Sequence, residues 1–212
     1  MNKLAELIGV ILGDGNIFIK EDKCYQLRIA CHANNDLGYV LYLNKLIKKV
    51  FNEQPYNYHK RNVIYVSISK RSIIEQLLLN GLKAGNKKKN NQGVPDWIFR
   101  KDSFMKNCLR GILDTDGCVY PKTKKHKTPS IWLKSAIPKL RNDVTIMLKL
   151  LGYTPQKWAK TSDPDVLQLC IGKSNEVIRF FKEVKFKNPK HIHRFRRSCN
   201  LARSRIKQLI GS

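Results

Sequence analysis

The feature that most constrains this chain is a nine-residue segment that occurs twice. The first copy, residues 7–15, reads LIGVILGDG, and the second, residues 109–117, reads LRGILDTDG. Each copy predicts an apolar helix that stops at Asp-Gly, because glycine commonly follows the last residue of a helix. Asp14 and Asp116 lie 102 positions apart in a chain of 212 residues. This spacing predicts a protein built from two related halves.

Small residues lie on one stripe of each predicted helix. Gly9 and Gly13 mark the stripe in the first copy, and Gly111 and Thr115 mark it in the second. A glycine inside a helix costs about 1 kcal/mol relative to alanine, so these glycines indicate that another segment packs closely there. Small residues let two helix backbones approach each other. We therefore predict that the two helices pack together through these four residues.

The patterns that follow each copy come in the same order, with helical periodicity and strand alternation in turn. In the first half the predicted helices are 3–14, 36–51 and 71–80, and the predicted hairpins are 16–32 and 56–69. In the second half the helices are 103–116, 137–151 and 174–183, the hairpins are 118–134 and 154–172, and a basic tail is helical from about residue 189. We predict an α+β fold with two pseudo-symmetric αββαββα halves, residues 1–96 and 97–212. In each half, helices cover one face of a four-stranded antiparallel sheet.

Positive charge dominates the composition. The chain has 41 Lys and Arg residues against 16 Asp and Glu residues, a formal net charge of +25. Such an excess indicates a polyanionic partner, and nucleic acid fits better than an anionic membrane surface. Residues 103–212 carry 24 basic and 7 acidic residues, whereas residues 1–102 carry 17 and 9. We expect the second half to hold a phosphate backbone more strongly.

Two further observations bear on location. No apolar run of about 18 residues is present, so we predict no membrane-spanning helix. The six cysteines form no CxxC pair and several fall at apolar-periodic positions, which predicts reduced thiols in an intracellular protein. We expect a nucleoid-associated protein of the cytoplasm or a protein of an organellar matrix.

The two Asp-Gly ends suggest a site. A carboxylate at a helix C-terminus opposes the helix dipole by a few tenths to about 1 kcal/mol, and a second carboxylate beside it adds repulsion. Two electrostatically unfavourable features at the same place tend to mark a functional site. A divalent cation would relieve the repulsion, and oxygen ligands favour Mg²⁺. Two carboxylates sharing metals beside a basic surface suit phosphodiester hydrolysis by two metal ions. The alternative, that Asp-Gly only ends a helix, accounts well for one copy but poorly for two matched copies.

These residues resemble the motif of the LAGLIDADG homing endonucleases, in the single-chain form with two motifs, and the resemblance covers essentially the whole chain. LRGILDTDG is close to the family consensus. LIGVILGDG departs at its sixth position, where Leu12 stands in place of the acid that Asp114 retains. The eighth position is the family's metal ligand, and both copies have Asp there. The resemblance implies two or more Mg²⁺ ions held by Asp14 and Asp116, with the adjacent Gly13 and Thr115.

The resemblance also implies a monomer whose two sheets form a saddle over double-stranded DNA, with the motif helices packed at the centre. Such a protein reads a long, asymmetric site through the major groove and cuts both strands across the minor groove, leaving 3′ overhangs. No protein-splicing blocks are visible, so we expect an intron-encoded or free-standing enzyme. Two alternatives use the same fold: an RNA maturase and a non-catalytic DNA-binding relative. A general RNA-binding protein fits less well, because no RNP, KH or zinc-knuckle signature is present.

The outward strand faces supply the predicted DNA-binding residues, since Arg, Lys and Gln there can read base edges while others meet phosphate. In the first half these residues are Asn16, Phe18, Lys20, Gln26, Arg28, His32, Tyr65, Ser67 and Ser69. In the second half they are Tyr120, Lys122, Lys124, Ser130, Trp132, Lys134, Trp158, Lys160 and Gln168.

Four cationic residues are predicted to assist catalysis. His32 lies 18 positions after Asp14, and Lys134 lies 18 positions after Asp116, so each half has a cation at a matched place. The resemblance implies that residues here position the attacking water or stabilise transition-state charge. Many relatives have a glutamine where this chain has Cys31, which leaves that half's contact to the water open. A further lysine follows the third helix of each half in this family; Lys87 and Lys190 fit best, although the run of lysines at 87–89 leaves the register open. An ordinary solvated basic loop is the alternative for both.

Overall fold

The structure, a computed structural model, describes residues 1–21, 23–121 and 128–210, with side chains described as far as residue 199. The first half contains α1 (Asn2–Leu12), β1 (Gly15–Lys20), β2 (Cys24–His32), α2 (Leu37–Phe51), β3 (Tyr56–Lys60), β4 (Val63–Ile68) and α3 (Arg71–Leu79). A 3₁₀ helix, η1 (Asp96–Arg100), precedes the second half. That half contains α4 (Asp102–Thr115), β5 (Gly117–Pro121), β6 (Pro129–Ser135), α5 (Pro138–Leu150), β7 (Ala159–Lys160), β8 (Leu167–Ile171), α6 (Ser174–Glu183) and α7 (Pro189–Ile210).

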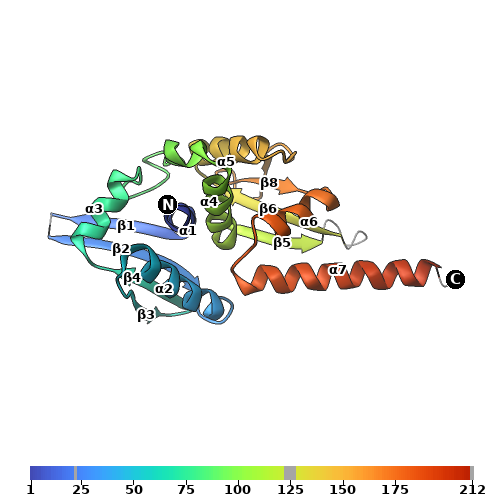
Figure 1. Cartoon of the computed structure of the whole chain (residues 1–212), viewed down its shortest axis with the longest axis horizontal. Helices are drawn as coiled ribbons and strands as arrows, with labels where there is room; N and C mark the ends of the chain where they lie inside the picture. The colour runs from blue at the N-terminus through green and yellow to red at the C-terminus, as the bar shows by residue number, and fades with distance from the viewer. Residues whose placement is uncertain (22, 122–127, 211–212) are drawn as a thin grey trace.

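The two sheets have the same topology. Their strand orders are β1-β2-β4-β3 and β5-β6-β8-β7, and every pair of neighbours is antiparallel. Helices α1 and α4 lie side by side between the sheets, at the centre of the molecule (Figure 1). The prediction of an α+β fold with two αββαββα halves and central motif helices is therefore confirmed.

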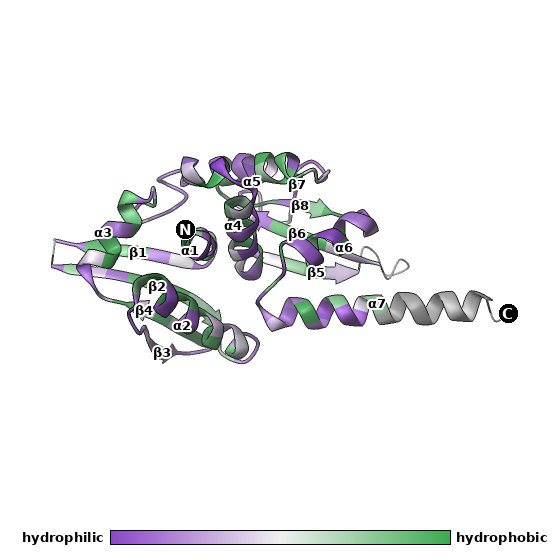
Figure 2. Cartoon of the chain, viewed as in Figure 1, coloured by the Kyte–Doolittle hydropathy of each residue, from purple (hydrophilic) through white to green (hydrophobic). Residues whose placement is uncertain are grey.

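Strand alternation explains which face of each sheet is buried. In the first sheet Ile17 pairs with Leu27, and Ile29 pairs with Val66; all four side chains are buried. Residues on one face of a strand recur every second position, so the same register turns polar residues such as Asn16 and Gln26 to the opposite face. Helices α2 and α5 are amphipathic, with green and purple segments along each ribbon in Figure 2.

Helix α7 begins at Pro189, as the sequence predicts, and continues for 22 residues away from the body of the molecule (Figure 1). Proline suits a first helical position because its missing N–H has no partner there anyway. The helix is anchored near its start by Phe195, whose ring stacks on Phe181 of α6 with 3.7 Å between ring centroids. Within the described part of the chain, no helix combines the length and apolar character that crossing a membrane requires.

Two elements differ from the prediction. Helix α1 ends at Leu12, two residues early, so Asp14 lies in the turn that enters β1 and not on the helix. Strand β7 has only two residues, although the prediction gave it the first arm of a hairpin over 154–172. Its sequence has no strong apolar alternation, so its pairing depends on β8 and not on its own pattern.

Candidate metal and nucleic-acid site

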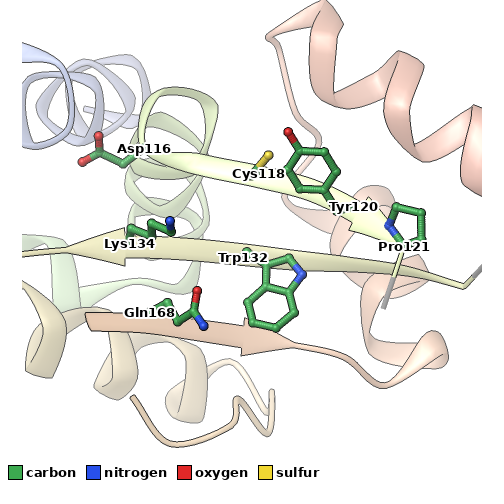
Figure 3. Close-up of a pocket in the computed structure, with 7 residues that line it drawn as sticks. All are labelled: Asp116, Cys118, Tyr120, Pro121, Trp132, Lys134 and Gln168. Atoms are coloured by element: carbon green, nitrogen blue, oxygen red, sulfur yellow. The ribbon is translucent and has the colours of Figure 1, made fainter. Parts of the chain in front are cut away.

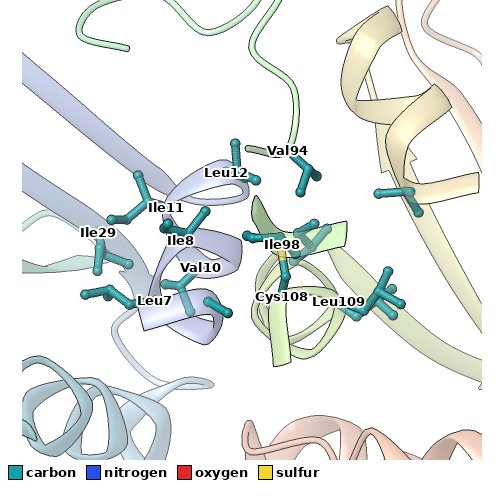
Figure 4. Close-up of a cluster of buried hydrophobic side chains, with 14 of the residues drawn as sticks. Leu7, Ile8, Val10, Ile11, Leu12, Ile29, Val94, Ile98, Cys108 and Leu109 are labelled. Atoms are coloured by element: carbon teal, nitrogen blue, oxygen red, sulfur yellow. The ribbon is translucent and has the colours of Figure 1, made fainter. Parts of the chain in front are cut away.

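The two motif helices touch backbone to backbone. A Cβ atom built on Gly9 would overlap the carbonyl of Cys108, 2.9 Å from its carbon. A Cβ on Gly111 would lie 2.5 Å from the amide nitrogen of Val10 and 2.8 Å from the carbonyl carbon of Gly9. No side chain fits at these distances. Figure 4 shows the apolar side chains that surround this contact between α1 and α4.

A buried ion pair crosses the same interface. Arg110 of α4 donates to Glu6 of α1 at 3.0 Å and to the carbonyl of Val184 at 2.6 Å. Glu6 also accepts a hydrogen bond from the hydroxyl of Tyr42 on α2. Burying charges costs free energy unless they are paired and hydrogen-bonded, and here each charge has more than one partner. The network fixes how the first half meets the second.

The helix contact brings the two predicted metal ligands together. A Cβ built on Gly13 would lie 3.5 Å from Oδ2 of Asp116, so the Asp116 carboxylate faces the turn that carries Asp14. The backbone carbonyl of Asp14 accepts the Ala30 amide at 3.1 Å, and the Asp116 amide donates to Ile112 at 2.9 Å. Both turns are thus held by their own halves. Asp14 is exposed and Asp116 is half-buried.

The two carboxyl groups have raised pKa values. Desolvation, followed by the charge of Asp14, raises the pKa of Asp116 to about 7. Asp14 is exposed as a residue, but the protein atoms around its carboxyl group desolvate that group and raise its pKa, and the charge of Asp36 adds to the effect. Lys87 and Lys190 oppose both shifts. Two carboxylates whose repulsion is only partly neutralised by lysines are suited to bind a divalent cation.

Lys87 closes the end of α1. Its ammonium donates to the carbonyl oxygens of Ile11 at 3.1 Å, Leu12 at 2.9 Å and Gly13. These carbonyls lack partners inside the helix, and a cation suits the negative end of the helix dipole. Desolvation lowers the pKa of Lys87, while Asp116 and Asp14 oppose that shift. Lys87 therefore lies at the end of α1, and it lines one pocket together with Gly13 and Asp116.

The end of α4 is closed differently. The carbonyl of Asp114 accepts the Asn188 side-chain amide at 3.1 Å and lies 3.3 Å from Nε2 of His191. Lys190 instead pairs with Asp36 at 3.0 Å. The end of α1 therefore has a charged group, the Lys87 ammonium, whereas the end of α4 has the neutral side chains of Asn188 and His191. Both Lys87 and Lys190 nevertheless lower the pKa of Asp14 and of Asp116.

Asp114 is buried and does not face the site. Its carboxylate accepts the backbone N–H groups of Lys187, at 3.0 and 3.1 Å, and Asn188, at 2.9 Å. It thus holds the segment that leads into α7. Burial raises the pKa of Asp114 to about 7, although these N–H groups oppose the shift. The matched residue of the first half, Leu12, is buried among apolar side chains instead.

His32 and Lys134 occupy the ends of their strands beside the two turns. Both side chains are exposed. Nδ1 of His32 accepts the amides of Asn34 at 3.2 Å and Asn35 at 3.3 Å. Lys134 lines a pocket of about 360 Å³ together with Asp116, Trp132 and Gln168 on the open face of the second sheet (Figure 3). This pocket connects Asp116 to the strand face.

The open face of the first sheet is polar and aromatic. Arg28 lies over the ring of Phe18, 5.7 Å from its centroid, and Tyr65 stacks on Tyr58 with 5.0 Å between centroids. The exposed predicted residues on this side are Asn16, Phe18, Lys20, His32 and Ser69, while Gln26, Arg28 and Tyr65 are partly exposed. The sequence predicted strand β3, but none of its residues was placed among the DNA-binding residues, although its register puts Tyr56 and Tyr58 on the same face as Ser67 and Tyr65.

Four predicted residues of the strand faces need correction. Ser67 and Ser130 share the outward register but are fully buried. Ser67 lies between the larger side chains of Arg28 and Tyr56, its direct partners in register. Ser130 donates to the Tyr120 carbonyl at 3.0 Å and accepts from Trp132 at 2.9 Å. Such small side chains support their neighbours and are not themselves open to a ligand.

Trp158 and Lys160 lie on the other side of their sheet. Lys160 pairs with Leu167, which shares a face with buried Leu169, and Trp158 donates to Thr145 of α5 at 2.9 Å. A shift of one residue turns every side chain of a strand to the opposite face. The prediction that these two residues face outward is therefore wrong, and Ala159 faces outward with Gln168. Lys122 and Lys124 fall outside the described residues.

The donor set around the two carboxylates fits a hard divalent cation. The described residues hold no cluster of three or more His, Cys, Asp or Glu side chains. Mg²⁺ needs none, because it is commonly bound by one or two carboxylates, waters and substrate phosphates. The Thr115 hydroxyl donates within its own helix, to the carbonyls of Gly111 and Ile112. The Gly13 carbonyl already accepts Lys87.

Comparison with known proteins agrees with this geometry. Residues 103–185 match the family model described as a LAGLIDADG-like domain, which supports the resemblance noted in the sequence over this part of the chain. No curated protein sequence matches the chain significantly.

Among solved structures, mesophilic variants of the homing endonuclease I-DmoI are 16% identical with a TM-score of 0.63, over 87% of this chain and 95% of theirs. The LAGLIDADG meganuclease I-AabMI, bound to uncleaved DNA, is 13% identical with a TM-score of 0.63, over 96% and 91%. The meganuclease I-SmaMI, bound to uncleaveable DNA, is 12% identical with a TM-score of 0.61, over 93% and 89%. At such identities the likeness shows a shared fold that extends over nearly the whole of each chain.

Proposed function

We propose that this chain is a site-specific endonuclease of the LAGLIDADG family that cuts double-stranded DNA with divalent metal ions; the family model over its second half and the shared fold support the proposal. One observation carries the proposal: glycine-packed helices bring Asp14 and Asp116 together between two open sheet faces. The net charge of +25 supports a polyanionic substrate. The relatives named above are reported bound to DNA, and I-DmoI also with DNA together with Mn, Mg or Ca.

In this proposal Asp14 and Asp116 hold the metal ions, with the backbone carbonyls of Gly13 and Thr115 as neighbouring oxygen donors. The bound ions would activate water and stabilise the charge of the phosphodiester transition state. Lys87 adds positive charge beside both carboxylates while fixing the end of α1. His32, Lys134 and Lys190 would orient the phosphates or the water around the same centre.

The open sheet faces would contact the DNA on either side of this centre. The residues proposed for this role are Asn16, Phe18, Lys20, Gln26, Arg28, His32, Tyr65 and Ser69 in the first half, and Tyr120, Trp132, Lys134 and Gln168 in the second. Arg28 and Gln26 are suited to read base edges in the major groove. The two faces carry different residues at matched positions, which suits a long, asymmetric site.

Several finer features remain proposals of the same kind. They are Mg²⁺ as the natural metal with two or more ions, 3′ overhangs, a monomeric enzyme with a boundary between residues 96 and 97, an intron-encoded gene, and a nucleoid or organellar location. An RNA maturase, or a regulator that binds DNA without cutting it, is the alternative. The pair of carboxylates favours the nuclease, because a regulator on this fold has no use for them.

Selection of cleavable sequences from a randomised duplex library, with Mg²⁺, tests the function. The wild type should enrich a single long site and cut both of its strands, and the double variant Asp14→Asn, Asp116→Asn should enrich none. Enrichment by the double variant, or no cleavage by a folded wild type, would reject the endonuclease. Binding of intron RNA without any DNA cleavage would favour the maturase.

The lysine at the end of α1 can be tested separately. Lys87→Met should reduce cleavage by about 10²–10³-fold, the usual effect of losing one charged group that stabilises a transition state. DNA binding should change much less, because one of many cations is removed. Single-turnover cleavage and a filter-binding assay measure the two effects. Lys89→Met is the matched control, since Lys89 is exposed in the same run; equal damage from both variants would contradict the assignment.

Salt should weaken DNA binding steeply. An interface with six to ten phosphate contacts loses roughly 10³–10⁵-fold in affinity between about 50 and 200 mM salt. We expect a loss in this range for the selected site, measured by fluorescence anisotropy. An affinity that barely changes with salt would contradict binding across two basic faces.

The variant Arg28→Gln should instead lower the affinity for the selected site more than the affinity for random DNA.

A further inference from the structure

A buried polar joint connects the start of α2 to the start of α7, beside the proposed metal site. Its centre is Asp36, which is 7% exposed, and its partner Asn188 is fully buried. One Asp36 oxygen accepts the Asn188 side-chain amide at 2.8 Å and pairs with the Lys190 ammonium at 3.0 Å. The other accepts the backbone amide of His32 at 3.0 Å. One carboxylate therefore holds three groups from both halves.

The Lys190 ammonium lies on the Asp14 side of the site: its partner Asp36 accepts the His32 amide, and Ala30, two residues earlier on the same strand, donates to the Asp14 carbonyl at 3.1 Å. The charge of Lys190 lowers the pKa of both Asp14 and Asp116. Its ammonium nevertheless pairs with Asp36, and its side chain is only 22% exposed. An ammonium is a donor with no acceptor capacity, so beside a carboxylate it occupies the lone pairs that a cation needs.

The joint restricts where that ammonium can go. Asn188 is held by Asp36 and also by Asp114, to which it donates both its backbone amide and its side-chain amide. Lys190 follows two residues later, and its own backbone amide donates to the Asn188 side chain at 3.2 Å. The backbone that carries Lys190 is thus fixed on both sides, and Asp36 supplies the matching negative charge.

We propose that Asp36 is a positioning residue that keeps the Lys190 ammonium off Asp14 and Asp116, so that both carboxylates stay open to divalent cations. The inference rests on the proposed metal site. Its distinguishing consequence is that the effect of Asp36 on metal binding passes through Lys190. A residue that only stabilised the fold, or only added negative charge near the site, would act whether or not Lys190 were present.

Mn²⁺ binding to the DNA-free protein, measured by titration calorimetry, tests the idea. Asp36→Asn should weaken Mn²⁺ binding by about tenfold or more, in the range found when outer partners of metal ligands are removed. Lys190→Met should not weaken it. The double variant Asp36→Asn, Lys190→Met should bind as Lys190→Met does, within about twofold. Thermal melts of all variants report whether each is folded.

The outcomes separate the inference from the proposed function. If Asp36→Asn weakens Mn²⁺ binding equally with and without Lys190, or not at all, the positioning role is overturned. If the wild type binds Mn²⁺ no better than the double variant Asp14→Asn, Asp116→Asn, the two-carboxylate site itself fails and the inference falls with it. If the double variant Asp36→Asn, Lys190→Met binds Mn²⁺ better than Asp36→Asn alone, the inference is supported. A variant that had merely misfolded would not recover Mn²⁺ binding when Lys190, a second member of the joint, was also replaced.

Discussion

Asp116→Asn should abolish cleavage and at the same time stabilise the metal-free protein. Loss of a metal-binding carboxylate should slow cleavage by about 10³-fold or more. DNA binding should survive, because the change removes a negative charge from a surface that faces phosphate. Asp14→Asn should have the same effect on cleavage. Single-turnover kinetics and a binding assay on the selected site measure the two effects.

The stability effect follows from the raised pKa of Asp116. Its pKa is about 7 in the folded protein, against an ordinary value of 3.8. Between these values the folded state holds a proton that the unfolded state has released, so stability falls as pH rises through this window. Above pH 7 the penalty is complete, and Asn avoids it. We expect Asp116→Asn to raise the free energy of unfolding by about 1–3 kcal/mol at pH 8 in chelator, and by little near pH 4.

Asp165→Asn provides the matched control for this prediction. Asp165 lies on an exposed loop, where the Lys88 ammonium lowers its pKa. The same chemical change there should neither stabilise the protein at pH 8 nor affect cleavage. An Asp116→Asn variant that cuts normally, or that is less stable than the wild type at pH 8 without metal, would contradict the account of the site.

Gly111→Ala should destabilise the protein by about 3–5 kcal/mol, or prevent folding. In an ordinary helix this change is favourable by about 1 kcal/mol. Here the added Cβ would lie 2.5 Å from the Val10 amide nitrogen and 2.8 Å from the Gly9 carbonyl carbon. Backbone atoms cannot rotate away, so α1 and α4 would have to separate. Urea unfolding followed by circular dichroism measures the change.

Gly38→Ala, in the first turn of α2, is the matched control. A Cβ there would meet only the ring of Pro189, at 3.0 Å from Cγ. We expect a change within about 1 kcal/mol of the wild type. If Gly111→Ala were as stable as Gly38→Ala, the backbone contact between the motif helices would not be what joins the halves.

Much of the fold follows from local patterns. The order of helices and strands repeats because each segment has its own periodicity, of two or of about 3.6 residues. Local patterns fail where a strand is very short or where neighbouring strands cover a side chain. Strand β7 has two residues, too few for alternation to identify the face of Lys160, and its register is set by β8. Ser67 has the predicted register, yet its neighbours across the sheet cover it.

The candidate site likewise contains residues that local patterns identify and residues that only the tertiary structure identifies. The run of lysines at 87–89 gives no means of choosing among its members from sequence. The structure separates them: Lys87 reaches the carbonyls at the end of α1, Lys88 pairs with Asp165 at 2.8 Å, and Lys89 is exposed. The difference depends on how the connection between the halves turns, which no local pattern encodes.

The sequence by itself determined that two apolar helices are each followed closely by an aspartate, Asp14 or Asp116, and carry glycines where another helix must approach. These are properties of single segments and of their repetition. Only the tertiary structure decided what surrounds the carboxylates: Lys87 at one helix end, Asn188 and His191 at the other, and Lys190 held by Asp36. Asp36 and Lys190 are far apart in the chain and have no shared pattern. They meet because α1 and α4 pack at backbone distance and carry the start of α7 against α2.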